Sequence, residues 1–349
     1  MKIMAKKGLY IYGIVPNFYG TTQFQLLENS GVYAITFQNI SAIVSDHETA
    51  HLDFLDRESL AHTLVHHQKT IEDLMTKGFR MIIPMKLGTI MNTREEVLSM
   101  LTKGYELIIA TLKEIEYLSE IDLAVTWADF TGTLKEIASH PDIIMLKEEL
   151  QQSGAALTQI DQVKIGMLLK EKLDEKNKAI ELKILEAFSS ISVDIKIHEV
   201  MNDQMITNSA VLIKSTQAGH FEKTIEKLDE EFHSALNFKI VGPLPCYSFF
   251  TLEVDKLNPD DVEKAKKMLG MKEKTNENDI KKAYLEKAKL FHPDNGYDPG
   301  DAEKFNEIQK AYHTLIDFSA SVRQWSKEED ISLAKDHVNE NLTLVKIKG

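Results

Sequence analysis

The chain has 349 residues, of which 43% are hydrophobic, and a formal net charge of −13 at pH 7. This length predicts two or three domains, and the acidic balance argues against nucleic acid as a main partner. Cys246 is the only cysteine, which excludes an internal disulfide and a multi-cysteine zinc site.

The first residues place lysines before a short apolar run, a pattern that a secretory signal can share. The run Leu9–Val15 ends at Pro16 and alternates aromatic with aliphatic residues, so it favours a β-strand instead. No stretch approaches the roughly 20 apolar residues that a membrane helix needs. We therefore expect a cytoplasmic protein without a membrane partner.

Residues 1–120 are predicted to form an α+β domain with helices on one face of a mostly antiparallel sheet. Strands are expected at Leu9–Val15, Val32–Phe37, Ser41–Val44 and Arg80–Pro84. A helix is expected at about Asp56–Lys77. A second helix should begin at Thr93, because Glu96 follows three residues later as in a capping box.

Residues 121–256 are predicted to form a second α+β domain. Its strands are expected at Ile121–Ala128, Val193–Val200, Met205–Ile213, Lys239–Val241 and Tyr247–Val254. The order strand–helices–strand–strand–helix–strand is that of a ferredoxin-like unit. Its longest helix, at about Leu157–Ser189, should bury one apolar stripe: Ile160, Val163, Met167, Leu173, Ile180 and Ile184.

The sharpest pattern in the chain is IKKAYLEKAKLFHPD, at Ile280–Asp294. Its helical part has an apolar stripe made of Ile280, Tyr284, Ala288 and Phe291. Pro293 prevents the helix from continuing, so a tight loop must follow. A second amphipathic helix has apolar residues at Phe305, Ile308, Tyr312 and Leu315. Two such helices joined by a short polar loop predict an antiparallel pair.

Residues 257–318 resemble the J domain of DnaJ-type co-chaperones in the lysine-rich helix, the His-Pro-Asp loop and the pattern KFNEIQKAYHTL. The resemblance implies that His292, Pro293 and Asp294 contact a DnaK-type chaperone and promote its ATP hydrolysis. The side chains expected to steer this partner are Lys281, Lys282 and Lys289. A plain helical hairpin with a solvated lysine face is the alternative.

Three residues of this helix depart from the J-domain pattern. Leu285 and Glu286 stand where that family often has Arg-Lys, and Lys287 stands where an apolar residue is common. Residues 319–349 are expected to be a polar C-terminal tail. Within it, Leu342–Ile347 has the composition of an edge strand.

The region Gly8–Lys256 resembles the gas vesicle protein F/L family. The segments that carry the resemblance are LYIYGIV, HHQKTIEDLM followed by RMIIPMKLGTI, and VGPLPCYSFFTLEV. The matching residues are His67, Glu72, Pro84, Gly88, Thr89, Gly242, Pro243, Pro245, Tyr247 and Phe249. Leu244 and Cys246 depart from the tryptophan and proline that are usual there.

This second resemblance implies two ferredoxin-like α+β domains and an accessory role in gas vesicle assembly. The implied partners are the small hydrophobic shell protein and other vesicle accessory proteins. The combined expectation is an assembly factor, associated with vesicles, that binds the shell protein and recruits a DnaK-type chaperone. The alternative is a structural minor component of the vesicle whose J domain is inactive or not essential.

No cofactor, metal or enzymatic activity is predicted. His62 and His66 have the i, i+4 spacing of a helical zinc site, but no H-E-x-x-H pattern and no third ligand accompany them. Gly88-Thr89 lacks the remainder of a phosphate-binding loop, which favours a shaped turn. Cys246 has no catalytic histidine near it in sequence, which favours a packed thiol.

Overall fold

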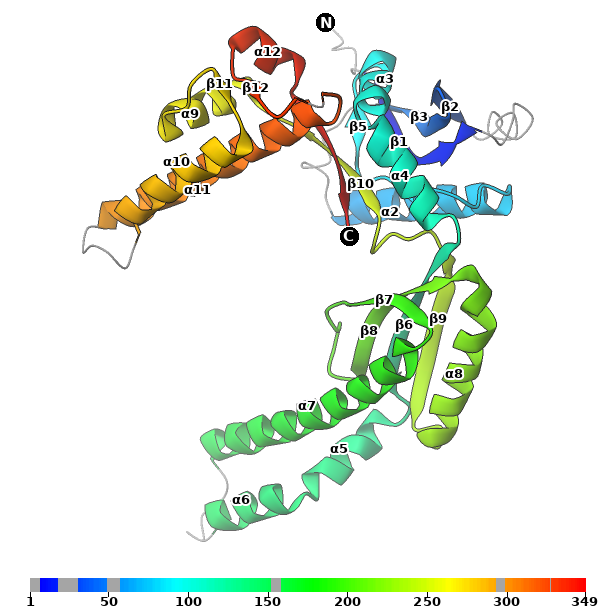
Figure 1. Cartoon of the computed structure of the whole chain (residues 1–349). Helices are drawn as coiled ribbons and strands as arrows, with labels where there is room; N and C mark the ends of the chain where they lie inside the picture. Colours follow the sequence, from blue (N-terminus) through cyan, green and yellow to red (C-terminus); the bar gives the residue numbers. More distant parts are fainter. Residues whose placement is uncertain (1–6, 18–30, 49–56, 152–157, 293–298, 327) are drawn as a thin grey trace, which may run out of the picture. The chain divides into compact units, whose positions relative to one another are not determined.

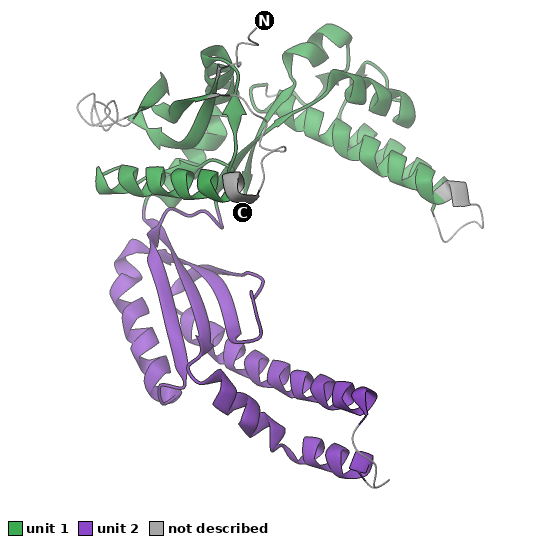
Figure 2. Ribbon diagram, turned by 180° about the vertical axis from the view of Figure 1, so that it is seen from behind, with its two compact units in different colours: residues 1–116, 250–349 green, residues 117–249 purple. Residues whose placement is uncertain are grey.

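The computed structural model describes residues 7–17, 31–48, 57–151, 158–292, 299–326 and 328–349 (Figure 1). The chain divides into two compact units (Figure 2). The first unit joins Met1–Glu116 to Phe250–Gly349, and the second unit is Tyr117–Phe249. Helices and antiparallel sheets in both units confirm the predicted α+β class. Among the residues described, no helix has the length and apolar character needed to cross a membrane.

The N-terminal part of the first unit is an antiparallel sheet packed against helices. Its strands are β1 (Lys7–Pro16), β2 (Val32–Phe37), β3 (Ile40–Glu48), β4 (Ile83–Pro84) and β5 (Ile90–Met91). Its helices are α2 (Arg57–Thr76), α3 (Arg94–Lys103) and α4 (Tyr105–Ile115). The strand order is β2-β3-β1-β4, and β5 also pairs with β1. Thr93 caps α3 as predicted, since its side chain accepts from the Glu96 N–H. The second half of the predicted capping box differs, because the Glu96 carboxylate accepts from the Asn92 N–H at 3.1 Å and not from that of Thr93.

The second unit has a four-stranded antiparallel sheet in the order β7-β8-β6-β9. Its elements are β6 (Leu118–Trp127), α5 (Phe130–Ala138), α6 (Pro141–Gln151), α7 (Gln159–Ser189), β7 (Ser192–Ile197), β8 (Met205–Lys214), the short 3-10 turn η3 (Ser215–Gln217), α8 (Ala218–Glu231) and β9 (Leu236–Leu244). If the strands of each sheet are numbered in chain order, the four strands on the main path of both sheets have the spatial order 2-3-1-4. This shared order supports the ferredoxin-like assignment, which stays a prediction.

The prediction that α7 buries its whole apolar stripe is wrong for the N-terminal half of the helix. Leu173, Ile180 and Ile184 are buried, but the three residues before them are exposed. The exposed residues and their exposed fractions are Ile160 (68%), Val163 (55%) and Met167 (69%). The reason is that only the C-terminal part of α7 packs on the sheet. Nearer its start, the helix packs on α5 and α6 through a different face.

The rest of the first unit begins with a helical segment. Its elements are α9 (Pro259–Leu269), β11 (Lys274–Thr275), α10 (Glu277–Leu290), α11 (Pro299–Arg323), β12 (Ile331–Ser332) and α12 (Lys335–Glu340). The helices α9, α10 and α11 share one core, in which Tyr284 stacks on Tyr312 with ring centroids 4.4 Å apart. Residues beyond Phe318, expected as a polar tail, contribute Ile331, Leu333 and Val338 to this core.

Two paired strands flank the helical segment. β10 (Thr251–Lys256) pairs antiparallel with β13 (Thr343–Lys348) over its whole length. β10 also lies beside β4, because Leu252 forms a bridge with Met85. The strand expected from Tyr247 therefore starts later, at Thr251, and belongs to the first unit. After β10 the chain folds into helices, and it then returns to pair with β10 through β13, so that the two strands form a sheet of their own.

Candidate interaction sites

α10 positions the predicted chaperone-binding residues. The helix begins at the cap of Asn276, whose side chain accepts from the Asp279 N–H at 3.0 Å, and it ends at Leu290. His292 follows and is exposed; its ring lies edge-on to Phe305 of α11, with centroids 5.5 Å apart. The rest of the predicted loop motif, Pro293 and Asp294, lies outside the described residues.

The predicted lysines lie exposed on the same helix. They are Lys281, Lys282 and Lys289. Leu285 and Leu290 are 48% and 72% exposed, so this helix presents apolar side chains to solvent as well as ammonium groups. Buried Ile280 and Ala288 fix the opposite side in the core. Such a surface can combine apolar contact with charge-assisted hydrogen bonds to carboxylates of a partner.

Three segments of the N-terminal family motif meet at the hydroxyl of Tyr10. This hydroxyl lies 2.9 Å from Nδ1 of His67, and it accepts the Gly88 N–H at 3.2 Å. Because it accepts from Gly88, its own proton is available for His67. Burial raises the pKa of Tyr10 to about 12, and burial lowers the pKa of His67 to about 4, with His66 acting in the same direction. Both groups are therefore neutral at pH 7.

The other residues of this motif have separate places. Pro84 is buried in β4 opposite Gly13 of β1. Thr89 accepts the Ile11 N–H through its carbonyl at 3.0 Å. Glu72 is exposed on α2, and its carboxylate accepts from the Gln68 amide at 3.3 Å. The motif therefore joins a helix, a strand and a loop around Tyr10, while Glu72 lies apart from this junction.

The histidines of α2 take part in hydrogen bonds of the fold. Nδ1 of His66 lies 3.3 Å from the Tyr12 hydroxyl, which also contacts Ser45. His62 and His66 line an open polar cavity of about 410 Å³. Within the described parts of the chain, no three His, Cys, Asp or Glu side chains are grouped to hold a metal ion.

The second motif covers a buried carboxyl group on β6. Glu120 is 1% exposed and accepts two hydrogen bonds of 2.8 Å from Ser248, one from its N–H and one from its hydroxyl. Burial raises the pKa of Glu120 to about 7, and burial also raises the pKa of neighbouring Asp122. A Cβ at Gly242 would lie 3.0 Å from the Glu120 carbonyl oxygen, so this close approach requires glycine.

The remaining motif residues form the turn above this carboxyl group. Pro243 follows a cis peptide bond, Pro245 is buried, and the Tyr247 N–H donates to the Pro245 carbonyl at 2.7 Å. Cys246 is 2% exposed, and burial raises the pKa of its thiol to about 12. The thiol is therefore protonated and packed at neutral pH, as the sequence predicted.

Sequence reasoning missed two of the residues around which these motifs are arranged. Tyr10 lies within the motif segment LYIYGIV, but the sequence predicted no role for it, and it predicted none for Glu120. Glu120 lies in an ordinary alternating strand, and its partner Ser248 is 128 positions away. The unusual feature of Glu120 is that this charged residue type is buried. Its burial cannot be read from the alternation of the strand and becomes visible only in the fold.

The fold and these sites define an α+β body joined to a J-type helical domain. Comparison with known families agrees: residues 8–251 match the family "Gas vesicle synthesis protein GvpL/GvpF", and residues 267–322 match the DnaJ domain. The chain belongs to the GvpL/GvpF family of gas vesicle proteins and carries a DnaJ domain in its C-terminal part.

Relatives divide in the same way. Gas vesicle protein F of Nostoc sp. (strain PCC 7120 / SAG 25.82 / UTEX 2576) is 23% identical over 244 residues, which cover 69% of this chain and 97% of that protein. Chaperone protein DnaJ 1 of Aquifex aeolicus (strain VF5) is 46% identical over 50 residues, 14% of either chain. The crystal structure of GvpF from Anabaena sp. PCC7120 has a TM-score of 0.55 at 24% identity, and it covers 69% of this chain and 97% of its own.

Proposed function

We propose that this protein is a gas vesicle assembly factor that binds the small hydrophobic shell protein and recruits a DnaK-type chaperone to it. The α+β body holds the client, and the DnaJ domain engages the chaperone. ATP is hydrolysed by the chaperone, so this chain is not itself an enzyme. The work takes place in the cytoplasm, at the growing vesicle.

The observation that carries the proposal is the fusion of the two families in one chain. A client-binding body and a chaperone-recruiting domain on one polypeptide raise the local concentration of the chaperone at the client. Exposed lysines on α10 and exposed His292 at its end support the chaperone contact. The shell protein and other vesicle accessory proteins are the partners that family membership favours.

The second candidate is a structural minor component of the vesicle with an inactive J domain. Leu285 and Glu286 favour it, because both are exposed on α10 where a basic pair is usual. A structural component should remain bound to vesicles after washing, whereas an assembly factor should be lost from them.

Steady-state ATP hydrolysis by the host's DnaK-type chaperone tests the proposal. We expect this protein to stimulate hydrolysis and the His292→Gln variant to return the rate to the basal value. His313→Gln is the matched control, since His313 is an exposed histidine on α11 of the same domain.

Charge reversal on α10 provides a second arm of the experiment. Lys281→Glu with Lys282→Glu should weaken stimulation most at low salt, because screening reduces the steering by exposed charges. Equal stimulation by all four proteins would place the chaperone contact elsewhere. No stimulation by the unmodified protein would favour the structural component.

A further inference from the structure

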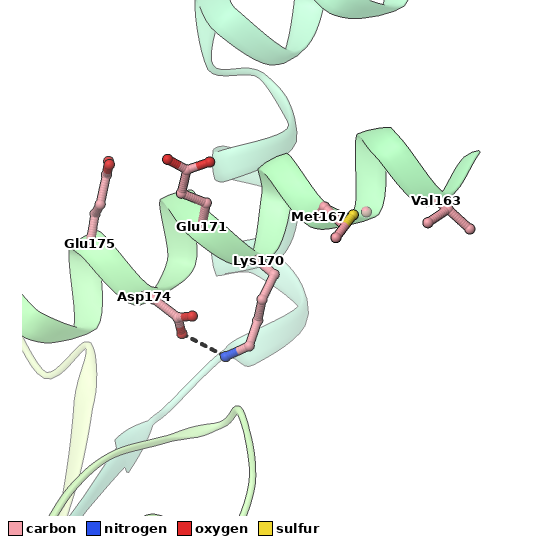
Figure 3. A pocket seen from close by; sticks show the side chains of 7 residues that line it. Val163, Met167, Lys170, Glu171, Asp174 and Glu175 are labelled. Carbon is pink, nitrogen blue, oxygen red and sulfur yellow. Dashed lines mark hydrogen bonds and ion pairs between the residues drawn. The ribbon is translucent and has the colours of Figure 1, made fainter. Parts of the chain in front are cut away.

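The N-terminal half of α7 carries a row of side chains with coiled-coil spacing. We call this row the α7 seam; its members are Ile160, Val163, Met167, Lys170 and Asp174. Successive members are separated by 3, 4, 3 and 4 residues, which is the spacing of the a and d positions of a heptad repeat. Figure 3 shows Val163, Met167, Lys170 and Asp174 along one side of the helix. The seam extends about 21 Å along the axis.

The apolar members of the seam pack against no other part of the unit that the structure describes. Its apolar members are 68%, 55% and 69% exposed. The helix packs on α5 and α6 through other residues, namely Ile165, Leu168, Leu169 and Leu173. Three large apolar side chains in line therefore face solvent. A partner helix that covered them would gain their burial without displacing a core contact of the residues that the structure describes.

The charged end of the seam has a surplus of carboxylates. The Lys170 ammonium lies 2.6 Å from Asp174 and 3.0 Å from Asp203, in the turn between β7 and β8. Glu171 occupies the e position beside the seam and forms no ion pair with any residue that the structure describes. In coiled coils, e positions pair with charges of the facing helix. Glu171 therefore favours a lysine or arginine on the partner at this end of the seam, whereas exposed Lys164, the e residue beside the apolar members, favours a carboxylate there.

Gly166 shows where a partner backbone could come close. It occupies the g position on the other flank, is exposed, and has nothing within 4 Å of where a Cβ would lie. Glycine lowers the stability of a helix interior, and the surroundings leave room for a larger residue. A surface hollow of about 650 Å³ runs along the helix from Val163 past Gly166 to Glu175.

We propose that the α7 seam docks one amphipathic helix of the shell protein, with its apolar residues on the seam and a cationic residue facing Glu171. This inference rests on the proposed function and names its client-binding surface. A second copy of α7 fits less well. Antiparallel pairing would set Lys170 and Asp174 against apolar residues, and parallel pairing would set like charges side by side.

Binding of fluorescently labelled shell protein, diluted from denaturant, to the full-length chain tests the inference. Val163→Gln with Met167→Gln should weaken the binding about tenfold or more, which corresponds to about 1.4 kcal/mol or more. Leu182→Gln with Val193→Gln is the matched control. These residues are 54% and 52% exposed in the same unit and lie outside the seam. The control should bind like the unmodified protein.

Gly166→Leu separates docking from folding. Leucine favours the helix and meets open space, so thermal stability should be unchanged or higher, but its side chain should keep a partner backbone away. We expect weaker binding of the shell protein at an undiminished Tm. Glu171→Gln should also weaken binding. The difference in affinity between this variant and the unmodified protein should shrink as the salt concentration rises, because salt screens the electrostatic interaction that the substitution removes.

The outcomes separate this inference from the function on which it rests. If the unmodified protein does not bind the shell protein, the proposed function fails and the inference fails with it. If all variants bind equally, client binding stands and the seam is overturned as its site. Self-association that is lost in the Val163→Gln, Met167→Gln variant would make a second copy the occupant and would also overturn the inference.

Discussion

At the residue scale, two of the motif segments of this chain are held together by single polar groups with several partners. The Tyr10 hydroxyl joins strand β1 to His67 of α2 and to the loop at Gly88. The Glu120 carboxyl group joins β6 to the turn at Ser248. In each case, one side chain replaces water for groups that the fold has buried. These contacts give the motif residues a role in holding the fold together.

Tyr10→Phe should lower the free energy of unfolding of the first unit by about 2 kcal/mol or more, because two polar groups lose their partner. Urea unfolding followed by circular dichroism measures the loss of stability. Hydrogen exchange of the Gly88 amide, which should become faster, reports the lost bond directly. Tyr33→Phe is the control on the same sheet. Its hydroxyl donates to Asp46 at an exposed site, so we expect a change within about 0.5 kcal/mol. Equal effects of the two substitutions would remove the special role of Tyr10.

At the element scale, the last strand is important for the N-terminal domain. Val345 of β13 lies against the junction of α3 and α4: a Cβ on Gly104 would be 2.9 Å from its Cγ1. Its backbone N–H and carbonyl are both bonded to the side-chain amide of Gln324, which substitutes for a further strand. This amide occupies backbone groups of Val345 that an edge strand would otherwise offer to another chain.

A double-mutant cycle tests the contact between Gly104 and Val345. Gly104→Ala should cost about 1–3 kcal/mol of stability, because its methyl group overpacks a filled site. Val345→Ala should also destabilise, by leaving a cavity. The double variant should cost less than the sum of the two, because each change relieves the other. Thermal and urea unfolding measure the three costs; strict additivity would contradict the contact.

The helix α7 illustrates a second effect at this scale. The helix has 31 residues and extends beyond the sheet on which it packs. The two halves of its amphipathic pattern therefore have different surroundings. Its C-terminal half buries the predicted stripe, and its N-terminal half presents the same stripe to solvent. A helical period indicates an apolar face but not what covers that face.

At the scale of the whole molecule, the two units should respond to pH in opposite directions. The lowered pKa of His67 means that the first unit loses stability as pH falls from 6.5 towards 4. The raised pKa of Glu120 means that the second unit binds more protons folded than unfolded between pH 4.5 and 7. The second unit therefore loses stability as pH rises through this window.

Trp127 allows the second unit to be followed alone in a Trp325→Phe background, since these are the two tryptophans of the chain. Its unfolding free energy should be greater at pH 5 than at pH 8, by up to roughly 3 kcal/mol. Glu120→Gln should remove most of this difference and stabilise the unit at pH 8, because the neutral amide accepts the Ser248 N–H through its oxygen and donates its NH2 group to the Ser248 hydroxyl. Glu175→Gln, at an exposed site of the same unit, should leave the difference intact.

The arrangement of the DnaJ domain also belongs to this scale. The helical segment is placed between β10 and β13, which pair along their whole length. The chain thereby enters and leaves the DnaJ domain through a pair of strands, of which β10 lies beside β4. Residues after Phe318, which composition indicated as a polar tail, contribute to the helical core and supply the strand that pairs with β10.

The sequence by itself determined whatever rests on local patterns. Helical and strand periods predicted the α+β class, Thr93 predicted the start of α3, and the lysine-rich helix with its His-Pro-Asp loop indicated the DnaJ domain. Motif segments indicated the GvpL/GvpF family because their residues keep their order along the chain. Each of these signals lies within a few residues, where steric and hydrogen-bonding preferences act directly.

Only the tertiary structure decided which residues meet. Tyr10 finds His67 57 positions away, and Glu120 finds Ser248 128 positions away. The final strand closes on β10, although nearly a hundred residues separate the two ends of the pair. The exposed half of α7 became visible once the extent of the sheet was known. Contacts at such separations depend on how whole elements pack, and no local propensity records that packing.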